Sequence, residues 1–327
     1  MQQEIELKLS LPEVHRSDFS ALALLKHYAS AEPRVQPQIS ALQNCYFDTP
    51  EQLLNQHAIA LRIRHSNGTF IQTLKTRGSS RGGLHQRHEW EWPVPSEQLQ
   101  LALLPDDVFP QTLQPASLQV AFHTDFQRSC WLLDYPLGDQ WASIELVLDS
   151  GWVSVGQRRD RICEIELELK DGPVEALFAL AAELAVELPL RISRVSKAEK
   201  GYRLNRRDQA FGGDDSSDDC PVILGHFELE NCQQWLDHLL MSLEEYQFER
   251  DSHWLNVALE AFDQLGQQLQ HGGAETELTG LLIQQHRSLE ELLALTPTDT
   301  QVQLWFERRE LGGCLLQISQ WLFQHPR

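Results

Sequence analysis

Charged residues alternate with aliphatic residues along much of the first two thirds of the chain. In residues 4–11, Glu4, Glu6 and Lys8 occupy every second position and aliphatic residues fill the positions between them. Side chains of a β-strand point alternately to its two faces, so these three charges would share one face. The longest alternation, in residues 162–170, again places carboxylates and a lysine at one phase. These patterns predict strands that each have one charged and one aliphatic face.

Further strand candidates fill the interval between these two segments. The Asn67-Gly68 pair predicts a hairpin turn, and Ser150-Gly151 predicts a turn followed by a return strand. Apolar residues recur at a period near 3.6 in residues 174–188, which predicts a helix. The additional strand candidates are residues 45–48, 61–64, 70–77, 85–94, 120–134 and 141–149.

About eight strands of this kind need an arrangement that shelters their aliphatic faces from water. A sheet closed into a barrel provides it when the charged faces point inward and helices cover part of the outer surface. In the reverse arrangement, the aliphatic faces point inward and the charged faces lie in solvent, which suits any single strand. A solvated surface gives no reason, however, for charges of both signs to recur at the same phase in strand after strand. We therefore predict an α+β fold with a closed antiparallel eight-stranded β-barrel, whose tunnel is lined by Glu, Arg and Lys.

The last third of the chain has a helical pattern and a different charge. Residues 1–207 contain 22 of the 27 Lys and Arg against 26 Asp and Glu, whereas residues 221–327 contain 5 basic and 16 acidic residues. A run of small and acidic residues at 208–220 predicts a linker between a domain of residues 1–207 and a bundle of residues 221–327. Helical spacing of apolar residues occurs in segments 227–250, 253–271, 276–294 and 301–325.

Composition excludes several classes of protein. No uninterrupted apolar run approaches the length of a membrane span, and the acidic, alternating first residues are unlike a secretory leader. The six cysteines form no C-x-x-C pair and show no regular spacing. Reduced thiols are typical of the cytoplasm, so we expect a cytoplasmic protein that does not bind membranes.

The first strand carries the earliest hint of chemistry. Two carboxylates about 7 Å apart along a strand, Glu4 and Glu6, followed at the same spacing by the ammonium of Lys8, can hold a divalent cation and an anionic oxygen side by side. The ordinary alternative is an edge strand with a solvated charged face. Other motifs decide between them, and they occur in this order: Tyr46-Phe47-Asp48-Thr49-Pro50, Leu61-Arg62-Ile63-Arg64, Thr73-Leu74-Lys75, Arg128, Glu164-Ile165-Glu166 and Ser196-Lys197.

This ordered set resembles the CYTH, or triphosphate tunnel metalloenzyme, superfamily over residues 1–207. The resemblance implies metal-dependent hydrolysis of a triphosphate in the tunnel, with Mg²⁺ or Mn²⁺ as cofactor and no side-chain nucleophile. By similarity, the metal ligands would be Glu4, Glu6, Glu164 and Glu166. The residues that clamp the triphosphate would be Lys8, Arg62, Arg64, Lys75, Arg128 and Lys197, and the catalytic set would be Glu4, Glu6, Lys8, Lys75 and Arg128.

Some residues depart from the family pattern or fit it loosely. Some small members have a lysine shortly before the arginine matched by Arg128, whereas this chain has His123 to Gln127 there, so we assign no general base. Glu89 and Glu145 are further candidates for metal or water contacts, although a carboxylate paired with a tunnel arginine explains them equally. We expect Glu168 and Lys170 to be solvated residues at the tunnel mouth.

The helical segment resembles a partial or degenerate CHAD domain, which follows the CYTH domain in bacterial inorganic triphosphatases. We therefore expect inorganic triphosphate as substrate, with a nucleoside or thiamine triphosphate as the alternative. A non-catalytic module that binds polyphosphate or a nucleotide is the rival from another class. With so few basic residues, the helical segment is not expected to bind polyphosphate or nucleic acid, and a role in forming a homo-oligomer is left open.

Overall fold

The computed structural model describes residues 2–29, 37–76, 78–105, 108–109, 114–206 and 229–325. The predicted linker at 208–220 lies outside these residues. The strands are β1 (Gln2–Ser10), β2 (Gln38–Asp48), β3 (Ala60–Ser66), β4 (Thr69–Lys75), β5 (Ser79–Arg81), β6 (Leu84–Val94), β7 (Gln119–Leu137), β8 (Gln140–Val155), β9 (Arg158–Asp171) and β10 (Arg191–Ile192). The helices are α1 (Arg16–Ala21), α2 (Ala23–Tyr28), α3 (Leu53–Gln56), α4 (Glu175–Glu187), α5 (Lys197–Arg206), α6 (Leu229–Glu249), α7 (His253–His271), α8 (Thr276–Ala294), α9 (Asp299–Phe306) and α10 (Arg309–Gln324).

The strands form one strongly curled antiparallel sheet in the order β10-β1-β9-β8-β7-β2-β3-β4-β6-β5. Strand β1 pairs with β9 through residues 6–10 and with β6 through residues 2–7, so it has a partner on both sides. The α+β class and the antiparallel sheet predicted from the sequence are confirmed.

The alternation in the sequence separates the two faces of this sheet. On β1 and β9, the odd-numbered residues Leu7, Leu9, Ile165 and Leu167 are fully buried in a large apolar cluster. Helix α4 contributes seven buried residues to the same cluster, because it lies between the sheet and α10. The even-numbered, charged residues of these strands therefore point to the concave side.

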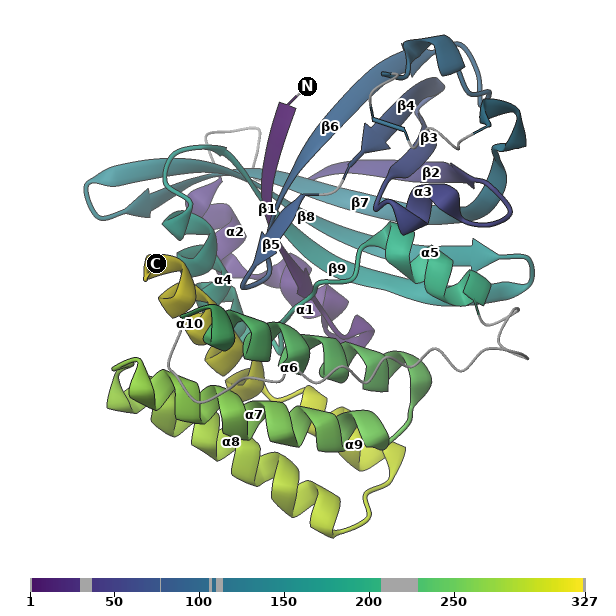
Figure 1. Cartoon of the computed structure of the whole chain (residues 1–327). Helices are drawn as coiled ribbons and strands as arrows, with labels where there is room; N and C mark the ends of the chain where they lie inside the picture. The colour runs from purple at the N-terminus through teal and green to yellow at the C-terminus, as the bar shows by residue number, and fades with distance from the viewer. Residues whose placement is uncertain are drawn as a thin grey trace.

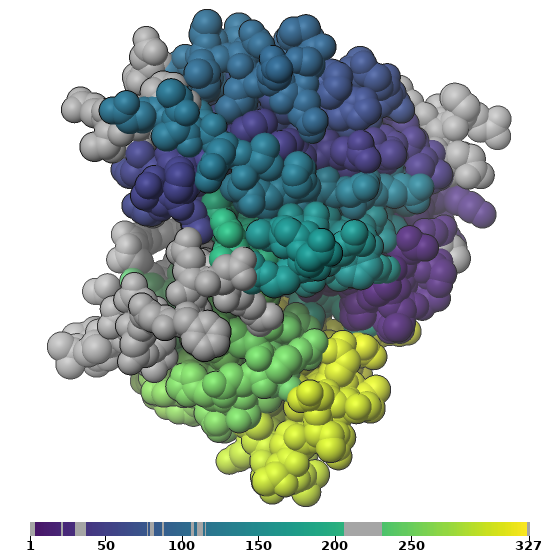
Figure 2. All heavy atoms as spheres, turned by 90° about the vertical axis from the view of Figure 1, so that its right-hand side faces the viewer, coloured from purple at the N-terminus to yellow at the C-terminus, as the bar shows by residue number. Residues whose placement is uncertain are grey.

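The helices after residue 229 pack together on one side of the sheet (Figure 1), as the green and yellow layer in Figure 2 also shows. Their buried residues belong to the same continuous cluster as buried residues of β1, β7, β8, β9 and β10, from Leu7 to Leu322. Helix α10 approaches the loop before β10 very closely. A Cβ placed on Gly312 would lie 1.6 Å from the carbonyl oxygen of Leu190, so only glycine fits there.

The structure corrects two elements. The last predicted helix, residues 301–325, is two helices, because Arg308 adopts an extended conformation (φ −78°, ψ 129°) between α9 and α10. Ser150 and Gly151 do not form a turn, because β8 continues to Val155. Gly151 instead marks a close approach of strands, since a Cβ there would lie 2.2 Å from the carbonyl oxygen of Asp125.

Candidate active site

The concave face of the sheet encloses a cavity of about 550 Å³, here called the central cavity. Nine of the ten predicted site residues line it, from strands β1, β3, β4, β7 and β9 and from helix α5. These nine are Glu4, Glu6, Lys8, Arg62, Arg64, Lys75, Arg128, Glu166 and Lys197. The tenth, Glu164, is not among the lining residues, and only 2% of its surface is exposed.

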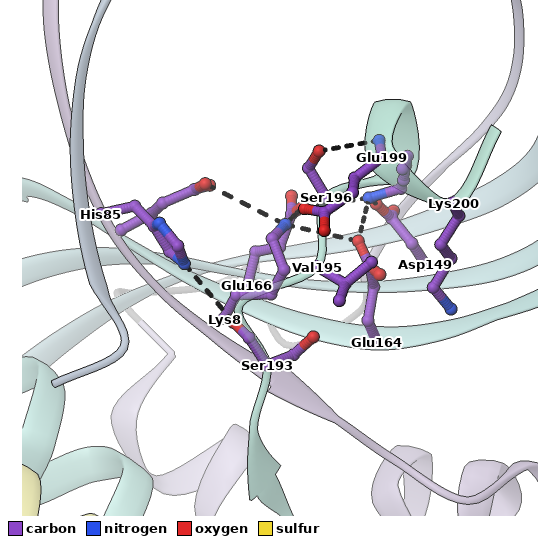
Figure 3. A network of polar contacts seen from close by, with 12 residues as sticks. Lys8, His85, Asp149, Glu164, Glu166, Ser193, Val195, Ser196, Glu199 and Lys200 are labelled. Carbon is purple, nitrogen blue, oxygen red and sulfur yellow. Dashed lines mark hydrogen bonds and ion pairs between the residues drawn. The ribbon is translucent and has the colours of Figure 1, made fainter. Parts of the chain in front are cut away.

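A network of buried charges forms the base of the cavity. Arg128 donates from Nε and Nη2 to the two carboxylate oxygens of Asp149, at 2.8 and 2.6 Å, and from Nη2 to Glu166 at 2.7 Å. The strand register explains the pairing, because Arg128 lies opposite Asp149, and Asp149 lies opposite Glu164. Figure 3 shows Glu166 beside Lys8, with Glu164 and Asp149 further along the same network. Sequence analysis did not assign Asp149 to the site.

Two lysines complete this network. The Lys8 ammonium group contacts Glu166 and lies 3.4 Å from Glu164. Lys197, in the first turn of α5, donates to Glu166 at 3.0 Å, contacts Glu164, and lies 2.7 Å from Asp149. Three cations therefore face three carboxylates, and the network is close to neutral overall.

The close contacts shift the pKa values of these groups. Burial alone would raise the pKa of Glu166, but Lys197 and Lys8 hold it well below its usual value. Burial would likewise raise the pKa of Asp149, whereas Lys197 and Arg128 lower it. Burial would lower the pKa of Lys8, but the carboxylates raise it well above its usual value. All these groups are therefore charged at neutral pH.

A second charged group lies on the wall formed by β1, β4 and β6. Lys75 donates to Glu4 Oε2 at 2.8 Å and lies 3.4 Å from Glu89. Arg62 Nη2 lies 3.7 Å from the other oxygen of Glu89. Glu89 is thus paired with two cavity cations, which fits the ion-pair alternative for this residue.

Arg64 differs from the other cavity cations. Its Nε donates to Asn44 Oδ1 at 3.1 Å, and within the described residues it forms no ion pair with a carboxylate. Burial, together with the nearby charges of Arg62 and Arg128, lowers its pKa to about 10. An uncompensated guanidinium in a cavity attracts an anionic ligand.

One end of the cavity is bordered by α5, whose position is fixed by two features. Gly201 lies where a Cβ would be 2.3 Å from the ring of Phe122, so the helix packs directly on that ring. Tyr202 donates to Asp48 at 2.8 Å, and Asp48 also accepts backbone N–H groups at the start of α3. Asp48, within the Tyr46–Pro50 motif, therefore holds α3 and α5 against β2 rather than contacting a ligand.

The register also brings three carboxylates into one row across adjacent strands. Glu6 lies opposite Glu168, and Glu168 lies opposite Glu145. Burial raises the pKa of Glu168; Lys170 opposes this rise, and the charges of Glu4 and Glu145 add to it. Glu168 was expected to be solvated, but it is half-buried and lines the cavity, whereas Lys170 is exposed at the cavity edge.

The carboxylates can be tested for their fit to a metal ion. Among the described residues, one group of three has oxygen atoms within 4.8 Å of one another: Asp149, Glu164 and Glu166. Carboxylate oxygens at this spacing suit hard divalent cations such as Mg²⁺ or Mn²⁺. Glu4 and Glu6 are not part of this group, so the four predicted ligands do not form one cluster in this structure.

Comparison with known proteins agrees with this geometry. The curled sheet encloses a charged cavity that suits a polyanion. The model of the CYTH domain family matches residues 2–202. The chain belongs to the CYTH domain family.

Individual relatives match over part of their length. An inorganic triphosphatase from Haemophilus influenzae is 34% identical over 209 residues, which cover 63% of this chain and 56% of the relative. The chain thus spans little more than half the length of that curated relative.

Among solved structures, the Hippeastrum protein HpAC1, described as having a dominant triphosphatase activity, is 20% identical with a TM-score of 0.44, covering 63% of this chain and 96% of its own. A Bacillus halodurans protein classed with adenylate cyclases is 23% identical with a TM-score of 0.35, covering 57% of this chain and 90% of its own. Within the described residues, no helix is both long and apolar enough to cross a membrane.

Proposed function

We propose that the protein hydrolyses a triphosphate in the central cavity, with inorganic triphosphate as the preferred substrate. The observation that carries this proposal is the set of six cations, Lys8, Arg62, Arg64, Lys75, Arg128 and Lys197, that face one cavity lined also by carboxylates. A simple anion-binding pocket has no use for so many carboxylates, whereas a site for a metal-bound polyphosphate requires both kinds of group. The name of the Haemophilus relative supports the choice of inorganic triphosphate.

The proposal includes a closed eight-stranded tunnel. The pairing of β1 with both β6 and β9 supports closure, because it joins the two ends of the strand order from β9 round to β6. A closed sheet has no free edge and holds its inward side chains at fixed spacing. Such spacing would let cations from opposite walls contact successive phosphates.

Cations on different strands would bind different phosphates of the substrate. Arg64, without a carboxylate partner, would contact a phosphate directly through its guanidinium fork. Lys75 and Arg62 would hold a neighbouring phosphate while Glu89 keeps both in position. Each bond from these groups to an anionic oxygen is charge-assisted and would strengthen as water leaves the cavity.

A divalent cation, Mg²⁺ or Mn²⁺, would be held by Asp149, Glu164 and Glu166, with Glu4 and Glu6 as further oxygen ligands closer to the substrate. When bound, the ion would neutralise charge on the phosphates and activate water for attack. The three carboxylates already pair with Lys8, Lys197 and Arg128. A bound triphosphate would draw these cations toward its oxygens and leave the carboxylates available to the ion.

Two alternatives have different consequences. A nucleoside or thiamine triphosphate would need room and contacts for its organic group, and the cavity lining is dominated by charged side chains rather than by an apolar or aromatic surface. A binding module without turnover would retain affinity but release no phosphate. The role of the helical segment as a partial CHAD-like module stays a prediction.

The decisive experiment measures phosphate release by the full chain with inorganic triphosphate, ATP and thiamine triphosphate, each with Mg²⁺ or Mn²⁺. We expect the highest kcat/KM with inorganic triphosphate. A clear preference for an organic triphosphate would overturn the choice of substrate. Binding without release from any of the three would favour the non-catalytic module.

A further inference from the structure

A second cavity of about 340 Å³ lies between the strands and helix α6, and it shares no lining residue with the central cavity. We call it the lateral cavity. Its walls come from the end of β1, from β9, β10 and α5, and from α6 and α9. A water molecule occupies about 30 Å³ in the liquid, so this space holds a small ion together with several waters. The basic residues that line it are Arg161, Arg191, Lys200, Arg203 and Arg250.

Arg191 on β10 is the central residue of this cavity. Only 7% of its surface is exposed. Its Nη2 donates to Gln247 at 2.9 Å, and its guanidinium lies 4.6 Å from the centre of the Phe306 ring. Its Nη1 is buried and has no hydrogen-bond partner among the residues that the structure describes.

The charge of Arg191 is not balanced by a close carboxylate. Within the described chain, no Asp or Glu oxygen lies within 4.0 Å of its guanidinium nitrogens. Burial lowers the pKa of Arg191 to about 10, an effect only partly offset by the more distant Glu244 and Glu307. A buried cation with an unpaired donor is costly unless something completes its hydrogen bonds.

The surrounding charges favour an anion. Three carboxylates line the cavity, but Glu13 pairs with Arg161, Asp160 accepts a backbone N–H, and Glu244 accepts the backbone N–H of Arg194 at 2.7 Å.

Arg203 forms ion pairs with Glu199 and Glu245, at 2.9 and 2.7 Å, whereas Lys200 and Arg250 keep their charge available. Lys200 donates to a backbone carbonyl, that of Arg161, rather than to a carboxylate. Arg250 is exposed and forms no ion pair within the described chain. Figure 3 shows the Lys200 side chain extending away from Lys8 and the carboxylate network of the central cavity.

We propose that the lateral cavity is a second anion site, which binds a small inorganic oxyanion of the phosphate class through the guanidinium of Arg191, with Lys200 and Arg250 at its sides. The bound anion completes the hydrogen bonds of Arg191 and joins the sheet to helices α6 and α9. It binds independently of the central cavity, because the two sets of lining residues are separate. The proposal does not depend on the triphosphatase activity.

The test uses the full chain without divalent metal and measures binding of radiolabelled inorganic phosphate by equilibrium dialysis. We expect two classes of site in the unmodified protein. Arg191→Gln should weaken one class at least about tenfold, since it removes a charge-assisted hydrogen-bond donor. Triphosphate turnover should stay within about twofold, because Arg191 does not line the central cavity. Arg64→Met should weaken the other class. Arg287→Gln, an exposed change on α8, is the matched control and should leave both classes unchanged.

Two further measurements test the same site by other means. If Arg191→Gln does not fold, Arg250→Gln changes an exposed residue and should weaken the same class by about threefold or more. Crystals soaked in tungstate should show an anomalous peak within hydrogen-bonding distance of the Arg191 guanidinium. The proposal would be overturned if phosphate binding were unchanged in both Arg191→Gln and Arg250→Gln, or if the tungstate peak were confined to the central cavity.

Discussion

Arg128 and Asp149 lie directly opposite each other on β7 and β8 and form a two-bond ion pair at 2.8 and 2.6 Å. The Asp149 side chain is fully buried, and Lys197 lies 2.7 Å from one of its oxygens. Asp149 therefore holds two of the cations that face the central cavity. We therefore expect both the stability of the protein and ligand binding to depend on Asp149.

Replacing Asp149 with asparagine should destabilise the protein strongly. The change leaves Arg128 and Lys197 without their shared buried partner, and breaking such a pair costs about 3–5 kcal/mol. Denaturant unfolding of Asp149→Asn should show this loss. Asp134→Asn, an exposed change on β7, is the control and should stay within about 0.5 kcal/mol of the unmodified protein. Equal stability of both variants would contradict the structural role of the pair.

The pH dependence of stability follows from the same network. Asp149 and Glu166 have folded-state pKa values below their usual 3.8 and 4.5. Their ionised forms therefore stabilise the folded protein above those values, and this stabilisation is lost as the pH falls. Lys8 has a folded-state pKa above its usual 10.5. Its charged form therefore stabilises the folded protein below that value, and this stabilisation is lost as the pH rises. The free energy of unfolding should therefore fall steeply below about pH 4.5. Urea titrations at several pH values should show a shallower fall for Glu166→Gln, and an equally steep fall would count against this assignment.

Arg64 and Arg128 should respond differently to the same substitution. Arg64 is a partly buried cation without a carboxylate partner among the described residues, so Arg64→Met should leave stability within about 1 kcal/mol, whereas Arg128→Met should cost about 3–5 kcal/mol. Loss of a charge-assisted hydrogen bond of about 1.5–3 kcal/mol should nevertheless raise the KM for triphosphate by about tenfold or more in Arg64→Met. Thermal unfolding and steady-state kinetics on the two variants measure the contrast. A large loss of stability in Arg64→Met would show that its charge is already compensated.

Glu4 and Lys75 are paired in the structure but should have separable roles. Glu4→Ala should abolish turnover, because we assign Glu4 to the metal, whereas Lys75→Ala should mainly raise KM, because we assign Lys75 to phosphate binding. Lys26→Ala, an exposed change on α2, is the kinetic control. Normal turnover in Glu4→Ala would remove Glu4 from the metal site.

Metal binding should depend on the substrate. Lys8, Lys197 and Arg128 neutralise the carboxylates that would hold the ion, so Mn²⁺ alone should bind weakly. A non-hydrolysable triphosphate analogue should tighten Mn²⁺ binding by about tenfold or more, and the linkage must be reciprocal. The loss of the free Mn²⁺ signal in electron paramagnetic resonance measures the affinity. The same affinity with and without the analogue would rule out the exchange of partners.

The sequence predicted the inner face of the sheet because charges recur at one phase on β1, β3 and β9. Asp149 was missed for a physical reason. On β8, Val147 occupies the inward position between Glu145 and Asp149, so the charged alternation is interrupted there. Only the register with β7 and β9 brings Asp149 beside Arg128 and Glu164, and register is a long-range property that a single strand does not encode.

The helical segment shows the same limit. Three helices could be located from periodicity, but the break between α9 and α10 could not, because the apolar spacing continues through it. The lateral cavity was also beyond sequence reasoning. Arg191 follows a helix and a proline without any charged alternation. Its guanidinium is covered by Gln247 of α6 and Phe306 of α9, which are distant in the sequence.

The close approach of α10 at Gly312 has a consequence for how substrate preference can change. The curvature of the strands determines the width of the central cavity, and the convex side of the sheet rests on α4, which in turn rests on α10. Packed interiors transmit small displacements rather than absorbing them. A side chain added at Gly312 would push α10 away from the loop before β10, against which it is packed. We therefore expect the outer helices to help set the width of the central cavity, so that substitutions remote from the cavity change which anions it admits.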